Sequence, residues 1–175
     1  MNYKAVIFDF DGTVCQTGEG IRKSAAYALE SMGFPVPEDE NELNFFIVPP
    51  LLVTFQERYG ADPQTAEELV KKYRERYTNI GVYESEPYDG IEQLLQALKQ
   101  DGLKIGIASS KPKKYIETLL ERDGLIKYFD SVCGVSFTVD CESKANIIGR
   151  CMKELNSPPE ETMMVGDKRY DIEGA

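Results

Sequence analysis

The sequence of 175 residues predicts an α/β fold, in which a parallel sheet is interrupted near its start by a helical insertion. The apolar run Ala5–Phe8, bounded by a glycine turn, is typical of a buried strand. Residues 18–81 show helical periodicity and no convincing strand. After Pro87 strand and helix patterns alternate, which indicates parallel strands joined by right-handed crossovers.

Two carboxylates follow the first predicted strand. Asp9 and Asp11 stand one residue apart in the segment Asp9–Val14, where the strand meets a glycine. Open α/β sheets bind ligands at the carboxyl ends of their strands. One carboxylate can attack a phosphoryl group while its neighbour moves a proton, because aspartate is a known nucleophile that forms an acyl phosphate.

The insertion consists of helices. Apolar residues recur at helical spacing over residues 21–32 and 51–59, and each run is closed by a glycine. Asp62 followed by Pro63 predicts an N-cap with proline at the first helical position. The helix after this cap is expected to extend through residues 66–80, with its apolar side chains on one face.

The segment after Pro87 completes a Rossmann-like, doubly wound sheet. Its expected helices are 91–98, 115–120 and 144–155, and its expected strands are 103–108, 131–135 and 162–165. The predicted α/β core therefore spans residues 1–17 and 82–175, and the inserted helical domain spans residues 18–81. The linkers at about 14–18 and 81–87 are expected to act as hinges, with plain connectors as the alternative.

Composition excludes several classes of protein. Lys and Arg number 20 and Asp and Glu number 30, for a net charge of −10, so nucleic acid is not an expected partner. No apolar run approaches the roughly 20 residues that span a bilayer. The sequence has no histidine, which excludes a Ser-His-Asp triad. The four cysteines have no metal-site spacing, and without a visible secretion signal they are expected to be cytoplasmic thiols.

Each later strand ends at, or leads to, a polar residue that suits phosphoryl chemistry. Ser109 follows the second strand, Lys144 follows the third, and Gly166-Asp167 follows the fourth, with Asp171 four residues on. A hydroxyl and an ammonium group can stabilise the oxygens of a transferring phosphoryl group. Several carboxylates at one sheet edge repel one another unless a cation lies between them.

The motif Val6-Ile7-Phe8-Asp9-Phe10-Asp11-Gly12-Thr13-Val14, together with these later residues in the same order, resembles the haloacid dehalogenase superfamily of phosphatases. The resemblance implies that Asp9 is the nucleophile, that Asp11 is the general acid and base, and that Lys144 supplies charge beside both the nucleophile and the phosphate. It also implies that substrate is bound by Ser109, Ser110 and Gly12.

The same resemblance implies a magnesium site. Asp9 and Asp167 would be direct carboxylate ligands, the backbone carbonyl of Asp11 a third ligand, and Asp171 a ligand through water. These are the oxygen donors that Mg²⁺ prefers.

The helical cap inserted after the first motif, and the stretches 46–51, 71–77, 88–91 and 109–112, resemble a branch often labelled phosphoglycolate phosphatase or 5′-nucleotidase. That branch usually has glycine where this chain has Val48, which bears on substrate specificity. The branch also continues past the GDxxxD motif, so a further helix and strand are expected beyond residue 175. The cap aromatics are expected to form mainly cap core, with base stacking as the alternative; they are Phe45, Phe46, Phe55, Tyr73 and Tyr77.

The expected function is a Mg²⁺-dependent phosphomonoesterase acting on a small phosphorylated metabolite, of phosphoglycolate or nucleoside monophosphate type, in a monomer or weak homodimer. The main alternative is a truncated, catalytically weak or non-enzymatic phosphate-binding protein of the same fold. A phosphorylated signalling receiver fits less well, because its aspartate follows a later strand. A phosphosugar mutase and a dehalogenase are also disfavoured, the latter because Asp11 is present.

Overall fold

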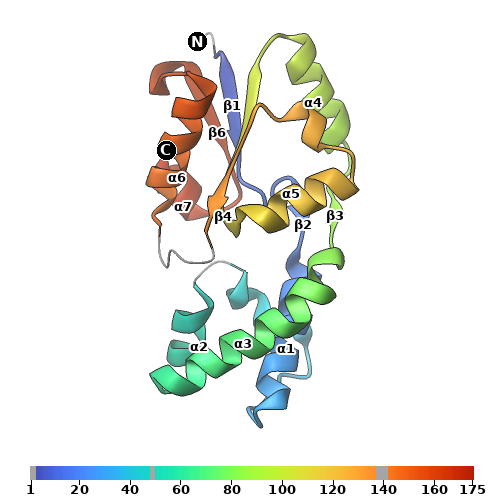
Figure 1. The fold of residues 1–175 in the computed structure, drawn as a ribbon, viewed down its shortest axis with the longest axis vertical. Coiled ribbons are helices and arrows are strands. Elements are labelled where there is room, and N and C mark those ends of the chain that lie inside the picture. Colours follow the sequence, from blue (N-terminus) through green and yellow to red (C-terminus); the bar gives the residue numbers. More distant parts are fainter. Residues whose placement is uncertain (1–2, 48–49, 137–141) are drawn as a thin grey trace. The chain divides into compact units, whose positions relative to one another are not determined.

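The computed structural model describes residues 3–47, 50–136 and 142–175 and is drawn in Figure 1. The chain forms two compact units, each with its own set of contacts. The core unit comprises residues 1–16 and 87–175, and the helical unit comprises residues 17–86.

The core unit is built on four parallel strands. They lie in the order β5 (Ser131–Val135), β4 (Lys104–Pro112), β1 (Ala5–Phe8) and β6 (Thr162–Val165). The predicted parallel α/β sheet is therefore confirmed. From β1 the chain adds β4 and then β5 on one side, and afterwards returns to add β6 on the other. The order of strands thus reverses at β1, which is where open α/β sheets bind their ligands.

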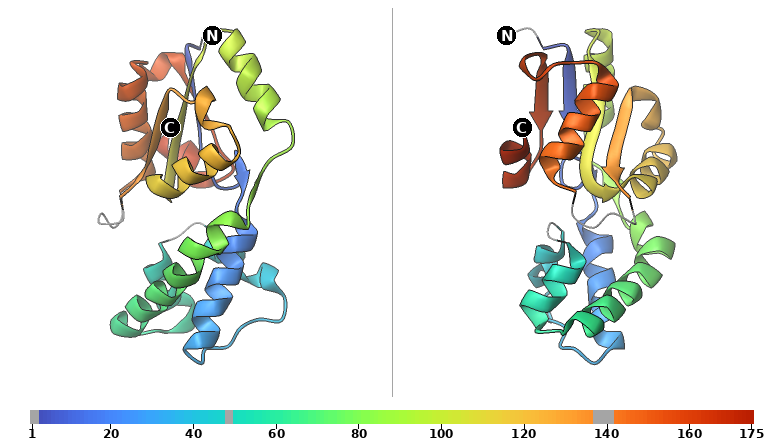
Figure 2. Two further views of the ribbon diagram at one scale, coloured as in Figure 1. Left: turned by 45° about the vertical axis from the view of Figure 1, so that its right-hand side comes forward. Right: turned by 60° about the vertical axis from the view of Figure 1, so that its left-hand side comes forward.

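Helices cover both faces of this sheet. Figure 2 shows α6 (Lys144–Leu155) on one face and α5 (Lys113–Arg122) on the other. The unit also contains α4 (Ile91–Gln100), the short α7 (Arg169–Gly174), and the 3₁₀ turns η3 (Ile126–Tyr128) and η4 (Pro159–Glu161). Helix α6 begins and ends at its predicted residues, because Ser143 caps its first turn and Asn156 adopts the left-handed conformation that ends it.

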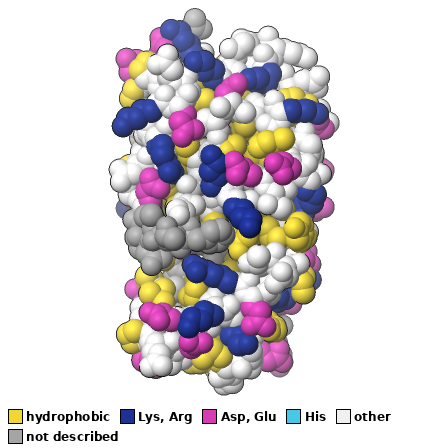
Figure 3. All heavy atoms as spheres, viewed as in Figure 1, with side chains coloured by type: hydrophobic (Ala, Val, Ile, Leu, Met, Phe, Trp, Pro, Cys, Tyr) yellow, Lys and Arg dark blue, Asp and Glu magenta, His cyan; other side chains and the backbone are white. Residues whose placement is uncertain are grey.

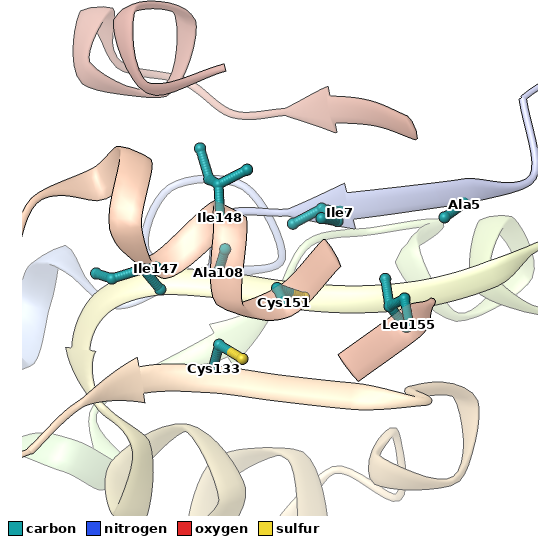
Figure 4. Close-up of a cluster of buried hydrophobic side chains, with 8 residues drawn as sticks. All are labelled: Ala5, Ile7, Ala108, Cys133, Ile147, Ile148, Cys151 and Leu155. Carbon is teal, nitrogen blue, oxygen red and sulfur yellow. The ribbon is translucent and has the colours of Figure 1, made fainter. Parts of the chain in front are cut away.

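A cluster of buried side chains joins α6 to the sheet (Figure 4). Ile147, Cys151 and Leu155 of α6 pack on Ile7 and other residues of the strands. Burying an aliphatic side chain of this size contributes about 1.5–3 kcal/mol, so this cluster fixes the helix whose first residue is Lys144. Three of the four cysteines lie within the described residues, and each is a buried thiol; they are Cys15, Cys133 and Cys151.

Strand β4 extends past its predicted end at Ala108. The pairing of β4 with β5 is regular up to Ala108 and resumes at Pro112, which is the partner of Val135. The register shift between these residues marks a bulge, which bends a strand and redirects its side chains. The polar segment 109–111 is therefore held within the sheet rather than in a loose loop.

The helical unit contains α1 (Gly18–Ser31), α2 (Leu51–Tyr59), α3 (Pro63–Asn79) and the 3₁₀ turns η1 (Glu40–Phe46) and η2 (Gly81–Tyr83). Over residues 18–47 and 50–81 it has no strand, as predicted. The predicted cap of α3 is also confirmed, because the Asp62 carboxylate accepts hydrogen bonds from the amides of Gln64 (3.0 Å) and Thr65 (3.1 Å).

Most of the cap aromatics form core of the helical unit, as expected. Four are buried, namely Phe46, Phe55, Tyr73 and Tyr77. The fifth, Phe45, is half-buried, and the Arg58 guanidinium lies 5.0 Å from the centre of its ring. Val48 lies outside the described residues.

A charged pair extends the helical unit beyond residue 81. Arg76 donates two hydrogen bonds to the Glu84 carboxylate, at 2.8 and 2.9 Å, and one to the Ser24 hydroxyl at 3.1 Å. Close backbone packing adds to this, since a Cβ atom on Gly20 would lie 1.8 Å from the Gly81 carbonyl oxygen. These contacts place the second boundary between the units at 86/87 rather than at 81/82.

Two very short strands, which the sequence did not predict, lie where the chain passes from one unit to the other. β2 (Cys15–Gln16) and β3 (Glu86–Pro87) pair as a two-stranded sheet. Both fall within the segments expected to be hinges, so these linkers are hydrogen-bonded to each other rather than separate.

Charged side chains of both signs are intermixed on the face drawn in Figure 3. Among the residues that the structure describes, no helix is both long enough and apolar enough to cross a bilayer.

Candidate active site

The candidate site forms at the carboxyl ends of β1 and β6, where the strand order reverses. Phe8, the last residue of β1, is paired with Val165 of β6 and with Ile107 of β4. The Asp9 amide donates a hydrogen bond to the Val165 carbonyl at 2.8 Å, which continues the ladder by one residue. Asp9 and Asp167 are thereby brought to the same edge of the sheet.

Lys144 links two of the predicted carboxylates. Its ammonium nitrogen lies 2.7 Å from an oxygen of Asp9 and 2.7 Å from an oxygen of Asp171. All three side chains are at most 9% exposed. An ion pair at this depth is screened by salt much less than an exposed one.

The pKa of Asp9 is raised above its ordinary value. Burial is the largest cause, because it disfavours the charged carboxylate, and the negative charges of Asp11 and Asp171 act in the same direction. Lys144 opposes the increase through its charge and its hydrogen bond. A second cation beside Asp9 would oppose this increase in pKa, and so would favour the ionised form that a nucleophile requires.

Three carboxylates could share such a cation. Asp9, Asp167 and Asp171 each offer an oxygen, and these oxygens lie within 4.8 Å of one another. Lys144 pairs with Oδ1 of Asp9, and Lys168 pairs with Oδ2 of Asp167, which leaves the second oxygen of each carboxylate outside these ion pairs. The donor set is hard oxygen only, which fits a magnesium ion.

Asp171 is held more firmly than the other two carboxylates. Its Oδ1 pairs with Lys144, and its Oδ2 accepts the Lys168 amide at 3.0 Å, at the start of α7. Both oxygens are therefore already engaged, which favours contact with a cation through water. In contrast, Asp167 is exposed and its lysine partner is 38% exposed, so Asp167 can adjust to a ligand.

Two glycines leave room for these closely spaced carboxylates. Gly12 has φ +87°, and a Cβ atom there would lie 2.5 Å from Oδ2 of Asp167. A Cβ atom on Gly166 would lie 2.3 Å from the Asp171 carboxyl group. The Gly12 amide donates to the Cys15 carbonyl at 2.9 Å. Gly12 thus shapes the loop and leaves room for Asp167, and its expected role in substrate binding stays a prediction.

Asp11 lies beside a lysine that sequence reasoning had given no role. The Lys111 ammonium nitrogen is 2.9 Å from Oδ1 of Asp11, and the Lys111 side chain is 4% exposed. The sequence alone gave no signal for this contact, because the two residues are far apart in the chain and a lysine before a proline usually lies at the surface.

The two predicted serines differ in exposure. Ser109 is buried, and its hydroxyl oxygen is 3.4 Å from the Lys111 amide, which donates to it. Ser110, the next residue in the bulged part of β4, is exposed. A buried hydroxyl and an exposed neighbouring backbone are therefore presented by one short segment, on the strand next to Asp9.

A carboxylate paired with a lysine whose side chain is 9% exposed, beside an acidic cluster at the switch point of a parallel sheet, is an arrangement suited to an enzyme of the phosphoryl-transfer class. The family comparison agrees. Residues 6–175 match the model of the haloacid dehalogenase-like hydrolase family. The chain therefore belongs to this family and is a phosphatase of the haloacid dehalogenase type.

Known proteins with high similarity have several activities in their names. A 5′-nucleotidase of Pseudomonas aeruginosa is 34% identical over 175 residues, covering 100% of this chain and 79% of that protein. The tyrosine-protein kinase PtkA of Mycobacterium tuberculosis is 33% identical, covering 97% of this chain and 57% of that protein. The crystal structure of a predicted phosphatase from Clostridium acetobutylicum has a TM-score of 0.92 at 38% identity, covering 100% of this chain and 81% of that one.

Proposed function

We propose that this protein is a Mg²⁺-dependent phosphomonoesterase that hydrolyses a small phosphorylated metabolite through an aspartyl phosphate on Asp9. One observation carries the proposal: Lys144 bridges Asp9 and Asp171 at 2.7 Å each, beside Asp167. This arrangement supplies an attacking carboxylate, a fixed positive charge and a set of oxygen ligands for a cation. Each of these is needed to move a dianionic phosphoryl group.

In the first step, the carboxylate of Asp9 attacks phosphorus. The bond between phosphorus and the ester oxygen breaks, and the leaving oxygen takes a proton from Asp11. Lys144 balances negative charge on the attacking carboxylate and on the phosphoryl oxygens. The Ser109 hydroxyl and the Ser110 amide bind the remaining phosphoryl oxygens.

In the second step, Asp11 takes a proton from water, and the water oxygen attacks phosphorus. The bond from phosphorus to Asp9 breaks, which releases inorganic phosphate and restores the Asp9 carboxylate. The same residue thus serves first as acid and then as base, so the carboxyl group of Asp11 must keep one orientation through both steps.

Asp9, Asp167, the backbone carbonyl of Asp11 and, through water, Asp171 would hold the magnesium ion. When bound, the ion neutralises charge on the phosphoryl oxygens and orients them. Two contacts support this assignment: Gly12 leaves room for the Asp167 carboxylate, and the Lys168 amide bonds to Asp171.

The proposed substrates are phosphoglycolate or nucleoside monophosphates. The nucleotide class is supported by the name of the P. aeruginosa relative. The net charge of −10 argues against a nucleic-acid polymer as substrate, since a polyanion would be repelled. We expect a monomer or a weak homodimer.

The test is a screen for phosphate release with Mg²⁺, using phosphoglycolate, nucleoside monophosphates and sugar phosphates. Asp9→Asn should abolish release, because the amide cannot attack phosphorus. Asp101→Asn is the matched control, because Asp101 is an exposed residue at the end of α4 that precedes β4, away from the carboxyl ends of the strands. Release that is unchanged in Asp9→Asn would reject the covalent mechanism.

A further inference from the structure

The contact between Lys111 and Asp11 joins two segments of the core unit that are far apart in sequence. The ammonium nitrogen and Oδ1 are 2.9 Å apart, with side-chain exposures of 4% for Lys111 and 15% for Asp11. A lysine is rarely buried to this degree unless it is paired. The burial of Lys111 therefore indicates a specific role, because a lysine that only adds charge to the surface would be exposed.

The backbone around Lys111 is fixed on both sides. Lys111 lies in the bulge of β4, its amide donates to the Ser109 hydroxyl, and the next residue pairs with Val135. Gly134 of β5 lies against this segment, because a Cβ atom there would be 2.5 Å from the Lys111 carbonyl oxygen. A side chain that starts from such a constrained backbone can hold its partner in one place.

Asp11, in contrast, lies in a loop that follows β1. The turn is closed by the Gly12 amide bonding to the Cys15 carbonyl, which fixes the backbone of the loop. The bond from Lys111 fixes one of the two oxygens of the Asp11 carboxyl group. A charge-assisted bond of this kind contributes more than a neutral one, and it restricts the rotamer.

We propose that Lys111 is a positioning residue, which holds the carboxyl group of Asp11 toward the leaving oxygen of the substrate. The proposal rests on the function proposed above. It assigns two lysines to different carboxylates: Lys144 serves the nucleophile Asp9, and Lys111 serves the proton-transferring Asp11. Losing Lys111 should therefore impair only the steps in which Asp11 donates or accepts a proton.

The leaving group separates these steps. The value of kcat/KM reports the reaction up to the transfer of phosphate to Asp9. An alkyl phosphate needs its leaving oxygen protonated in that step, whereas p-nitrophenyl phosphate does not, because nitrophenolate leaves unaided. A residue that acts through Asp11 should thus affect kcat/KM for the alkyl phosphate alone.

The experiment compares Lys111→Met with wild type on p-nitrophenyl phosphate and on the best alkyl phosphate found in the screen. We expect kcat/KM to fall about 10–100-fold for the alkyl phosphate, a part of the usual contribution of a positioned acid, and less than about threefold for p-nitrophenyl phosphate. Lys111→Arg should recover part of the loss. Lys113→Met is the matched control, since Lys113 is 51% exposed and pairs with Glu117 at 3.6 Å.

Asp11→Asn and the double variant complete the test. The double variant should be no slower on the alkyl phosphate than Asp11→Asn alone, because both changes remove the same function. An equal fall on both substrates in Lys111→Met, or additive losses in the double variant, would overturn the proposal. If Lys111→Met does not fold, the same comparison with Lys111→Arg and Lys111→Gln decides it, because uniform losses in both would again overturn it.

Failure of the proposed function has a different signature. In that case wild type would release phosphate from neither substrate, or Asp9→Asn would release it as fast as wild type. A wild type that depends on Asp9 and Asp11, with Lys111→Met indifferent to the leaving group, would reject only the role of Lys111.

Discussion

Replacing Lys144 by methionine should destabilise the core unit strongly at neutral pH. Methionine keeps most of the length of the side chain but leaves the carboxylates of Asp9 and Asp171 without their shared cation. Breaking a buried ion pair by removing one partner typically costs about 3–5 kcal/mol. Here one lysine serves two carboxylates at 2.7 Å, and all three side chains are at most 9% exposed, so a value in the upper part of this range is expected.

The loss of unfolding free energy caused by Lys144→Met should depend on pH in a defined direction. Without Lys144, Asp9 can relieve its repulsion with the Asp171 carboxylate by binding a proton. The pKa of Asp9 is already raised by burial in the wild type, and it rises further when the opposing charge of Lys144 is removed. The difference in unfolding free energy between wild type and variant should therefore be largest at pH 7 and shrink as pH falls through the raised pKa of Asp9 in the variant.

The assay is urea unfolding of both proteins at several pH values, with and without Mg²⁺. Mg²⁺ should recover part of the loss, since a cation beside Asp9 replaces some of the missing charge. Lys113→Met controls for the loss of an exposed lysine, and should change stability by less than about 0.5 kcal/mol. A loss below about 1 kcal/mol at pH 7, or a loss that does not change with pH, would refute this reasoning.

Three further predictions follow from single residues. Gly12→Ala should lower the free energy of unfolding by about 1–2 kcal/mol, because φ at this residue is +87°. Because the added Cβ displaces Asp167, a metal titration should show that the Mg²⁺ concentration for half-maximal activity rises roughly tenfold. Glu84→Gln should destabilise the helical unit by about 1–2 kcal/mol at pH 7. The Arg76 guanidinium lowers the pKa of Glu84, so the stabilisation is complete above the ordinary glutamate pKa and is lost as pH falls through the lowered one; unfolding curves of the two proteins should converge in acid. Gly134→Ala should force the backbone of residues 111–113 away from β5. In the steady-state comparison used for Lys111, kcat/KM should then fall more for alkyl phosphates than for p-nitrophenyl phosphate. An equal fall for both substrates would contradict this prediction.

Sequence reasoning located most elements of the fold because their signals are local. Strands β5 and β6 and helix α6 have their predicted bounds, since apolar periodicity and capping residues mark both ends of each. The end of β4 was wrong by four residues, 108 against 112, because apolar content fades at Ser109 while the backbone stays extended through the bulge.

The arrangement of the candidate site could likewise be predicted only in part from the sequence. The closeness of Asp9, Lys144, Asp167 and Asp171 could be predicted because each follows a strand or begins a helix at a recognisable motif. Lys111 was missed because its pairing depends on how the sheet brings two strand ends together. The boundary at 86/87 was missed for a similar reason, as Glu84 joins the helical unit through contacts such as its bonds to Arg76 and to the Gly20 amide.

The pairing of β1 also bears on the order in which the chain folds. Ala5 is a register partner of Lys104 on one side and of Thr162 on the other, so the central strand must wait for segments that are synthesised much later. Closing such long loops costs entropy before any contact repays it, and non-local pairing slows folding. The helical unit, by contrast, is one continuous stretch of chain. On a ribosome it can assemble first, while β1 acquires both of its neighbouring strands only after β6 has emerged.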